Sequence, residues 1–261
     1  CACCPPTLAR YLPQVPGFAY ATRGNELFVN LFIAGEAEVE VGGATWKLKQ
    51  EGNYPWDGRV KLVLLIPAPV GADVRRLNSA AAGDQSLVTS APTIWLRIPG
   101  WARNEPVPGD LYRFANQAAD ARTLTVNGQR VELRNVLTNG FARLTRNWRS
   151  GDVIELDLPM PVRRVVAHPE VRDCAGKVAL QRGPIVYCFE GADHGGRVLD
   201  LALPADTVFA PRRRDDLLGG TIVLEGELIR AGERIRATAI PYHLWSNRSA
   251  GEMVVWLDSG N

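Results

Sequence analysis

Apolar and polar residues alternate along most of the chain with a period of two, the pattern of β-strands with one buried face. The alternation is clearest in AEVEV (37–41), TWKLK (45–49) and VIELDL (153–158). Continuous apolar runs, such as LFVNLFI (27–33) and RVKLVLLI (59–66), predict strands that are buried more deeply. Further strands are predicted in TIWLRI (93–98), KVAL (177–180), PIVYCF (184–189), TIVLEGELI (221–229), IRATAIPY (235–242) and MVVWLD (253–258).

Glycine and asparagine separate several of these strands at the spacing of tight hairpins. Gly42-Gly43 lies between two alternating runs, and Asn127-Gly128 and Asn139-Gly140 readily take the positive φ angles that such turns need. Many short strands joined by turns of this kind predict an all-β fold. We expect two β-sandwich, jelly-roll-like domains.

The first seventeen residues have a helical pattern instead. Leu8, Tyr11 and Leu12 recur at helical spacing, and the prolines before them suit a first helical turn, where a backbone N–H has no partner. Pro13 and the Pro16-Gly17 pair end the pattern. Residues 1–17 therefore predict one short helix.

The predicted domain boundary follows the prolines at 159 and 161. We expect the first β-sandwich to span 18–160 and to be closed by the final strand at 251–258, and the second to span 161–250. The Ala-, Gly- and Ser-rich residues 68–92 predict a surface insertion. A polar loop is predicted at 204–220, with the basic run Arg212 to Arg214 solvated there.

Composition excludes some classes of protein. The chain has 261 residues, enough for two moderate domains, and a formal net charge of +2, which argues against a nucleic-acid partner. No apolar run reaches 18 residues, so no membrane span is expected. The cellular compartment stays unassigned.

The chain begins CACCPP without a methionine, and we expect it to be a fragment. The clustered thiols of Cys1, Cys3 and Cys4 are open to three interpretations: ligands of zinc, a nucleophile, or semi-buried thiols at a helix start. Cys188 lies in an apolar run, so we expect its thiol to be buried. For Cys174 we expect a free thiol in a loop. The three histidines, His168, His194 and His243, are scattered along the chain, so spacing alone predicts no closed zinc site.

Blocks spread over nearly the whole chain resemble glycoside hydrolase family 127, the β-L-arabinofuranosidase type. In chain order the blocks are CACCPPTLAR (1–10), NYPWDGRV (53–60), LRIPGWA (96–102), ALQRGPIVYC (179–188), AIPYHLWSNR (239–248) and GEMVVW (251–256). Each block is weak alone, but together they make the resemblance specific. It implies a full-length parent with an N-terminal (α/α)6 barrel and two β-sandwiches, so that the short helix is the last helix of a missing barrel.

The resemblance also implies the chemistry of the cysteine pair. Cys3 is similar to the family's nucleophile and to one zinc ligand, and Cys4 to a second ligand, while Cys1 matches no known ligand. The remaining Glu and Cys ligands, and the Glu that acts as general acid, belong to the barrel. The implied reaction is glycoside hydrolysis with retention through a thioglycosyl intermediate. Zinc is thus implied for the parent, and we expect the fragment alone to bind it weakly and to be inactive.

Two alternatives for the fragment itself are a carbohydrate-binding module and a purely structural module that supports the barrel or a homodimer. The tryptophans at 56, 101 and 245 could stack on sugars, but core or domain-interface packing is the favoured interpretation. Glu36, Glu38 and Glu40 occupy every second position of a strand and predict a solvated face, not a catalytic pair. A carbohydrate substrate is the expected partner of the parent.

Overall fold

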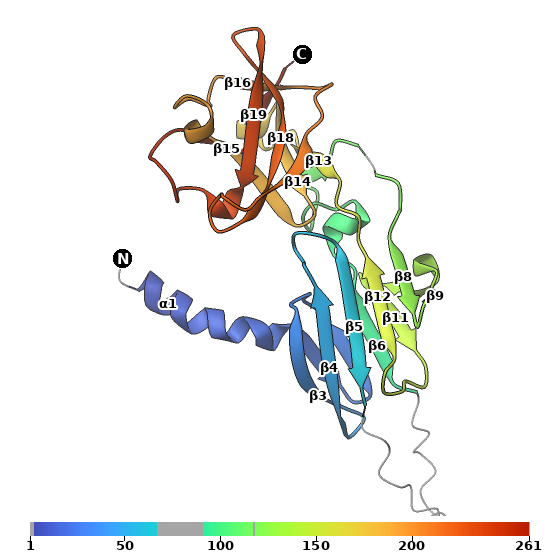
Figure 1. The fold of residues 1–261 in the computed structure, drawn as a ribbon. Helices are drawn as coiled ribbons and strands as arrows, with labels where there is room; N and C mark the ends of the chain where they lie inside the picture. Colours follow the sequence, from blue (N-terminus) through green and yellow to red (C-terminus); the bar gives the residue numbers. More distant parts are fainter. Residues whose placement is uncertain (1–2, 67–90, 117, 261) are drawn as a thin grey trace, which may run out of the picture. The chain divides into compact units, whose positions relative to one another are not determined.

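The computed structural model describes residues 3–66, 91–116 and 118–260, and the chain divides into two compact units. Unit 1 comprises Cys1–Tyr54, Arg59–Ile98 and Arg122–Asp157, and unit 2 comprises Pro55–Gly58, Pro99–Ala121 and Leu158–Asn261. Both units consist mainly of strands, as predicted (Figure 1). Residues 68–90 of the predicted insertion lie outside the described residues.

One short helix at the front of the chain is confirmed. Helix α1 spans Cys4–Tyr11 with proline in its first turn, and the 3-10 helix η1 spans Leu12–Phe18. No residue of either helix is buried. The other helical segments of the described residues are single turns: η3 (Gly100–Arg103), α2 (Leu133–Val136), η4 (Arg172–Cys174), η5 (Gly191–Asp193) and η6 (Tyr242–Leu244).

The described residues of unit 1 form two sheets. The five-stranded sheet has the order β1-β2-β6-β11-β10, with strands Tyr20–Arg23, Glu26–Val29, Thr93–Arg97, Phe141–Thr145 and Leu137–Thr138. The six-stranded sheet has the order β3-β4-β5-β12-β8-β9, with strands Gly35–Val41, Ala44–Gly52, Arg59–Leu65, Val153–Asp157, Thr123–Val126 and Gln129–Arg130. In both sheets alternate residues are buried, for example Leu27 and Ile94 in the first and Leu62 and Ile154 in the second. Each sheet therefore buries one face, which is what the predicted β-sandwich requires.

The predicted hairpin turns of unit 1 are confirmed. Strands β3 and β4 meet at Val41 and Ala44 around the Gly42-Gly43 turn. Asn127 and Asn139 have φ angles of 52° and 50°, the left-handed conformation that a type I′ turn requires.

Unit 2 is a closed barrel where the sequence predicted a second β-sandwich. Its ring of paired strands runs β14-β15-β19-β18-β16-β21 and returns to β14. The six strands are Lys177–Arg182, Ile185–Glu190, Glu233–Pro241, Thr221–Arg230, Leu201–Pro204 and Leu257–Gly260. Alternation in sequence shows that one face of a strand is buried, but a sandwich and a barrel share that property. Closure of a sheet into a barrel depends instead on pairing between strands that are far apart in sequence. The alternating pattern alone therefore did not distinguish a barrel from a sandwich.

Four more strands extend this sheet: β7 (Tyr112–Phe114), β13 (Val162–Ala167), β17 (Ala210–Arg214) and β20 (Met253–Val254). The predicted loop at 204–220 is therefore wrong in part, because β17 pairs with β18 along its whole length. Its arginines are solvated as predicted, since Arg213 and Arg214 form exposed ion pairs with Asp215 and Asp216.

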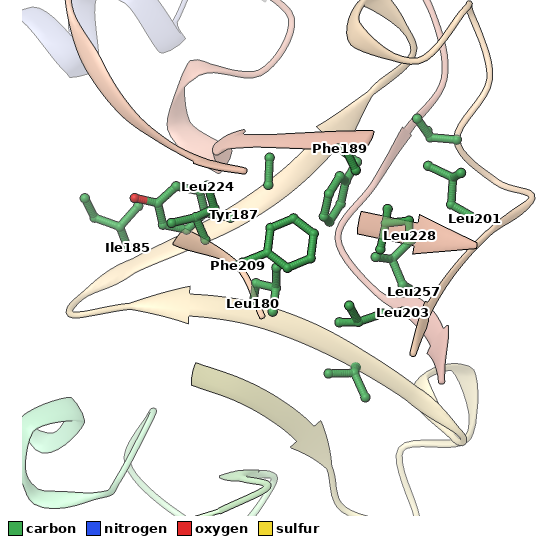
Figure 2. Close-up of a cluster of buried hydrophobic side chains, with 14 residues drawn as sticks. Leu180, Ile185, Tyr187, Phe189, Leu201, Leu203, Phe209, Leu224, Leu228 and Leu257 are labelled. Carbon is green, nitrogen blue, oxygen red and sulfur yellow. The ribbon is translucent and has the colours of Figure 1, made fainter. Parts of the chain in front are cut away.

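The core of unit 2 fills the barrel. Figure 2 shows Tyr187 and Phe189 of β15 pointing into a cluster of leucines from the surrounding strands. Phe189 packs edge-on against Phe209, with ring centroids 5.8 Å apart. Burial of these large side chains stabilises the barrel.

The predicted domain limits need two corrections. The final strand does not close the first domain, because β21 pairs with β14 and β16 of unit 2. Residues 55–58 and 99–121 lie within the predicted first domain but belong to unit 2. A single boundary near residue 160 would divide the chain into two continuous stretches. Each unit instead consists of three stretches that are separate in sequence.

Gly58 of unit 2 lies against backbone that leaves no room for a side chain. A Cβ at this position would be 1.8 Å from the carbonyl oxygen of Leu158, whose N–H donates to the Gly58 carbonyl. Gly58→Ala is therefore expected to destabilise unit 2 by about 2 kcal/mol or more in chemical denaturation. Gly251→Ala is the control, because its Cβ would meet only the Gly191 Cα, at 3.9 Å. Equal stability of the two variants would contradict the prediction.

Candidate active site

The cysteine pair lies at the start of α1. Cys3 is the N-cap residue, with φ −76° and ψ −27°, and Cys4 is the first residue of the helix. Both thiols are exposed and free. The Cys3 carbonyl accepts hydrogen bonds from the N–H of Thr7 at 3.1 Å and from its hydroxyl at 2.8 Å. The first helical turn thus fixes the backbone that carries both sulfurs.

Helical backbone brings the two sulfurs close together. The Cys3 Sγ lies 3.9 Å from the Cys4 Sγ. In extended backbone adjacent side chains point to opposite faces, so the proximity depends on the helical backbone at this position. Two thiolates bound to one tetrahedral zinc ion at about 2.3 Å lie about 3.8 Å apart. The pair therefore fits half of the ligand set of a zinc ion, with Cys3 and Cys4 as its holders.

No further donor joins the pair in the described part of the chain. Among those residues no group of three or more His, Cys, Asp or Glu side chains is close enough to share a metal ion. Cys1, the third thiol of the motif, lies outside the described residues. A tetrahedral site needs four ligands, so two would have to come from elsewhere.

The three histidines contact backbone groups or an aromatic ring of unit 2. His194 is buried, and its Nδ1 lies 2.7 Å from the Glu190 carbonyl oxygen while its Nε2 accepts the Thr238 N–H. His168 Nδ1 accepts the N–H of Glu170, and the His243 ring lies 6.1 Å from that of Trp56. With both ring nitrogens in use, His194 supports the fold of the barrel.

The other two described cysteines differ from the pair in their surroundings. Cys188 is fully buried in β15, as predicted, and its burial raises the pKa of the thiol to about 12. Cys174 ends the single turn η4 as a free, half-buried thiol. A thiol that is buried and protonated does not act as a nucleophile near neutral pH.

This contrast predicts selective labelling of the native chain. Iodoacetamide at pH 8 is expected to modify Cys3 and Cys4 and to leave Cys188 unmodified, because alkylation needs an accessible thiolate. Peptide mapping by mass spectrometry measures each site separately. Labelling in denaturant is the control, since Cys188 then becomes accessible. Modification of Cys188 at the same rate as the pair in the native chain would contradict the expectation.

A partly buried charge cluster fixes the segment that carries the AIPYHLWSNR block. The Nε of Arg248 donates to Glu190 at 2.9 Å, and its Nη1 and Nη2 donate to both carboxylate oxygens of Asp193. Glu190 also accepts the N–H of Ser246 at 3.0 Å. These carboxylates raise the pKa of the Arg248 guanidinium above its ordinary value, with Asp193 making the largest contribution. Sequence analysis missed this cluster, because its members are up to 58 residues apart.

The three tryptophans of the family blocks have different environments. Trp101 is buried and Trp56 packs against the barrel core, so the favoured packing interpretation holds for these two. Trp245 is 41% exposed and its ring stacks on that of Tyr242, with centroids 6.0 Å apart. Trp245 is therefore not a core residue, and domain-interface packing stays a prediction for it. Glu36, Glu38 and Glu40 are exposed on β3, as predicted.

Known protein families match both halves of the chain. Residues 26–160 match the β-L-arabinofuranosidase GH127 middle domain, and residues 162–258 match the glycoside hydrolase family 127 C-terminal domain. The two matches divide at residue 161, next to the predicted boundary. The class of protein is thus that of the glycoside hydrolases.

Individual relatives of the chain support the same class of protein. A non-reducing end β-L-arabinofuranosidase of Bifidobacterium longum is 33% identical over 98% of this chain. The crystal structure of a GH127 β-L-arabinofuranosidase from Geobacillus stearothermophilus T6 matches the whole chain with a TM-score of 0.80 and 36% identity. A further GH127 β-arabinofuranosidase structure matches with a TM-score of 0.83 and 34% identity. The chain belongs to glycoside hydrolase family 127.

The chain spans only part of these relatives. It covers 37% of the Bifidobacterium enzyme and 38% and 39% of the two structures. No helix in the described ranges is long and apolar enough to cross a membrane.

Proposed function

We propose that this chain is the C-terminal part of a retaining glycoside hydrolase that acts on β-L-arabinofuranosides, and that Cys3 is its nucleophile. The observation that carries the proposal is the pair of exposed thiols, with sulfurs 3.9 Å apart, at the start of α1. The names of the relatives support the substrate class. The exposed, free state of Cys3 supports its role, because a nucleophile must reach the substrate.

The proposed reaction has two displacements. In the first, the Cys3 thiolate sulfur forms a bond to the anomeric carbon while the bond to the leaving oxygen breaks, and an acid outside this chain protonates that oxygen. In the second, water gives a proton to the conjugate base, attacks the same carbon and expels the Cys3 thiolate. Two inversions return the original anomeric configuration.

The two sulfurs would serve as ligands of the zinc ion that the proposal includes. Cys3 and Cys4 would hold the ion, and a bound zinc would keep both thiols deprotonated at neutral pH. Helix α1 has the role of an orienting element, since its first turn holds the Cys3 carbonyl through Thr7. We further propose that α1 is the last helix of an (α/α)6 barrel and that the two sheets of unit 1 form a β-sandwich.

The experiment compares two lengths of protein. A polypeptide extended at its N-terminus to the length of the relatives is expected to hydrolyse an aryl β-L-arabinofuranoside. The 261-residue chain is expected to show no measurable turnover and to bind zinc at least about tenfold more weakly, because two thiolates supply only half of a tetrahedral site. Hydrolysis by both forms is measured from aryl alcohol release, and zinc by competition with a chromophoric chelator.

Either of two results would contradict the proposal. One is turnover by the 261-residue chain at the rate of the extended protein. The other is an extended, folded protein that binds zinc but hydrolyses no arabinofuranoside.

A further inference from the structure

A cleft of about 670 Å³ lies on unit 1, between the β8–β9 hairpin, α2, β10 and β11. Three of its lining residues are arginines: Arg130, Arg143 and Arg146. None of the residues that line it is acidic. The cleft therefore concentrates positive charge in a chain whose net charge is only +2, and the volume is that of a site for a small oligosaccharide.

Two of the arginines are held in place by tryptophan rings. The guanidinium carbon of Arg143 lies over the Trp95 ring, 5.5 Å from its centroid, and that of Arg146 lies 5.3 Å from the centroid of Trp148. Both rings are themselves fixed, because Trp95 Nε1 donates to Glu26 and Trp148 Nε1 donates to the Pro92 carbonyl. Cation–π contact engages the face of a guanidinium and leaves its edge free to donate hydrogen bonds.

Within the ranges that the structure describes, no carboxylate lies within ion-pair distance of these two guanidinium groups, although Arg143 and Arg146 lower the pKa values of Glu26 and Asp152 through longer-range attraction. Neither Arg143 nor Arg146 forms an ion pair there, whereas Arg130 forms an exposed pair with Glu132 at 3.2 Å. The nearby Asp152 carboxylate already accepts from the Asn127 amide and the Arg149 N–H. Arg143 and Arg146 are therefore positioned cations with free donors, which match the oxygens of a carboxylate.

The rest of the lining suits a sugar. Gln129, Asn135 and Thr138 offer donors and acceptors for hydroxyl groups. Val131 offers apolar surface for the C–H face of a ring. A nucleic acid would need a broader basic surface than a chain of net charge +2 provides.

From the arginines, their tryptophan supports and the mixed lining, we propose that this cleft binds an oligosaccharide bearing carboxylate groups. The uronate carboxylates pair with Arg143 and Arg146, and the ring hydroxyls contact the amide and hydroxyl side chains. The inference concerns unit 1 alone and does not rest on the proposed hydrolase activity.

Titration of the 261-residue chain with a galacturonic acid trimer tests the proposal. Tryptophan fluorescence and calorimetry are expected to show saturable binding, since Trp95 and Trp148 contact the two arginines that would pair with the carboxylates. The double variant Arg143→Gln, Arg146→Gln is expected to bind at least about tenfold more weakly. The matched control is Arg212→Gln, an exposed arginine of unit 2, and it is expected to bind like the parent chain. The methyl-esterified trimer, which lacks the charges, is expected to bind at least about tenfold more weakly as well.

Several results would each overturn the proposal. They are no saturable binding of the trimer, equal binding of the esterified trimer, and equally tight binding of a hexaglutamate peptide or a short oligonucleotide. Unchanged affinity of the folded double variant would also overturn it. If that variant fails to fold, as judged by circular dichroism, the comparison of free and esterified trimers decides.

Discussion

Replacing Cys3 by alanine in a polypeptide extended to the length of the relatives is expected to lower kcat/KM for an aryl β-L-arabinofuranoside by about 10⁴-fold or more. The reason is that the proposed first displacement has no sulfur to form the bond to the anomeric carbon. Cys3→Ser is expected to be nearly as inactive, because a hydroxyl ionises far less readily than a thiol. Steady-state kinetics with an aryl glycoside measures both variants.

Two further variants separate the role of the sulfur from damage to the protein. Cys174→Ala removes a free thiol on a single turn of unit 2 and is expected to keep the parent rate. Cys4→Ala removes the second sulfur of the pair, so it is expected to lose both zinc and activity. Incubation of the parent with an arabinofuranosyl inhibitor that traps the nucleophile is expected to modify Cys3. A Cys3→Ala protein as active as Cys174→Ala would refute the assignment of the nucleophile.

Strands and hairpins could be predicted from the sequence because their signals are local. The alternation in 153–158 corresponds to β12, whose Ile154 and Leu156 are buried while Glu155 and Asp157 are exposed. The Asn127-Gly128 turn is likewise a local property of two residues. Such features depend only on residues that are adjacent in the chain, so they can be predicted from the sequence.

The closure of unit 2 could not be predicted in this way. It depends on pairs such as Lys177 with Asp258 and Tyr187 with Pro241, which are far apart in sequence. Strand β17 was missed because the run Arg212 to Arg214 is charged on successive residues, and an edge strand in water tolerates charge on both faces. A polar segment is thus not evidence for a loop.

The candidate site was predicted in part. The motif pointed to Cys3 and Cys4, but the 3.9 Å separation of their sulfurs is a side-chain distance that the predicted helix over 1–17 did not by itself give. The arginines of the unit 1 cleft gave no sequence signal, since Arg130 and Arg143 lie in separate strands. Their common feature is a cleft whose lining contains no acidic residue, which only the folded chain reveals.

The second large effect is expected at the charge cluster of unit 2. Glu190 is 5% exposed and joins β15 to the segment that carries Ser246 and Arg248. Glu190→Ala removes an acceptor from the Ser246 N–H and leaves the Arg248 guanidinium, whose side chain is 18% exposed, with Asp193 alone. Breaking a buried ion pair from one side costs more than the pair contributes, because the remaining charge is left in a poorly solvated place. We expect unit 2 to lose about 3 kcal/mol of stability.

Hydrogen exchange of the β15 and β19 amides, together with urea denaturation, measures this loss within unit 2. Glu190→Gln is expected to lose less than Glu190→Ala, because its side-chain oxygen still accepts the Ser246 N–H. The control is Arg234→Ala, which breaks ion pairs to Asp206 and Glu227 on the surface of the same unit, where solvent screens the charges. That control is expected to exchange and unfold like the parent chain. If Glu190→Ala behaves like Arg234→Ala, the cluster contributes no more than an exposed pair, and the Arg248 segment must be held by other contacts.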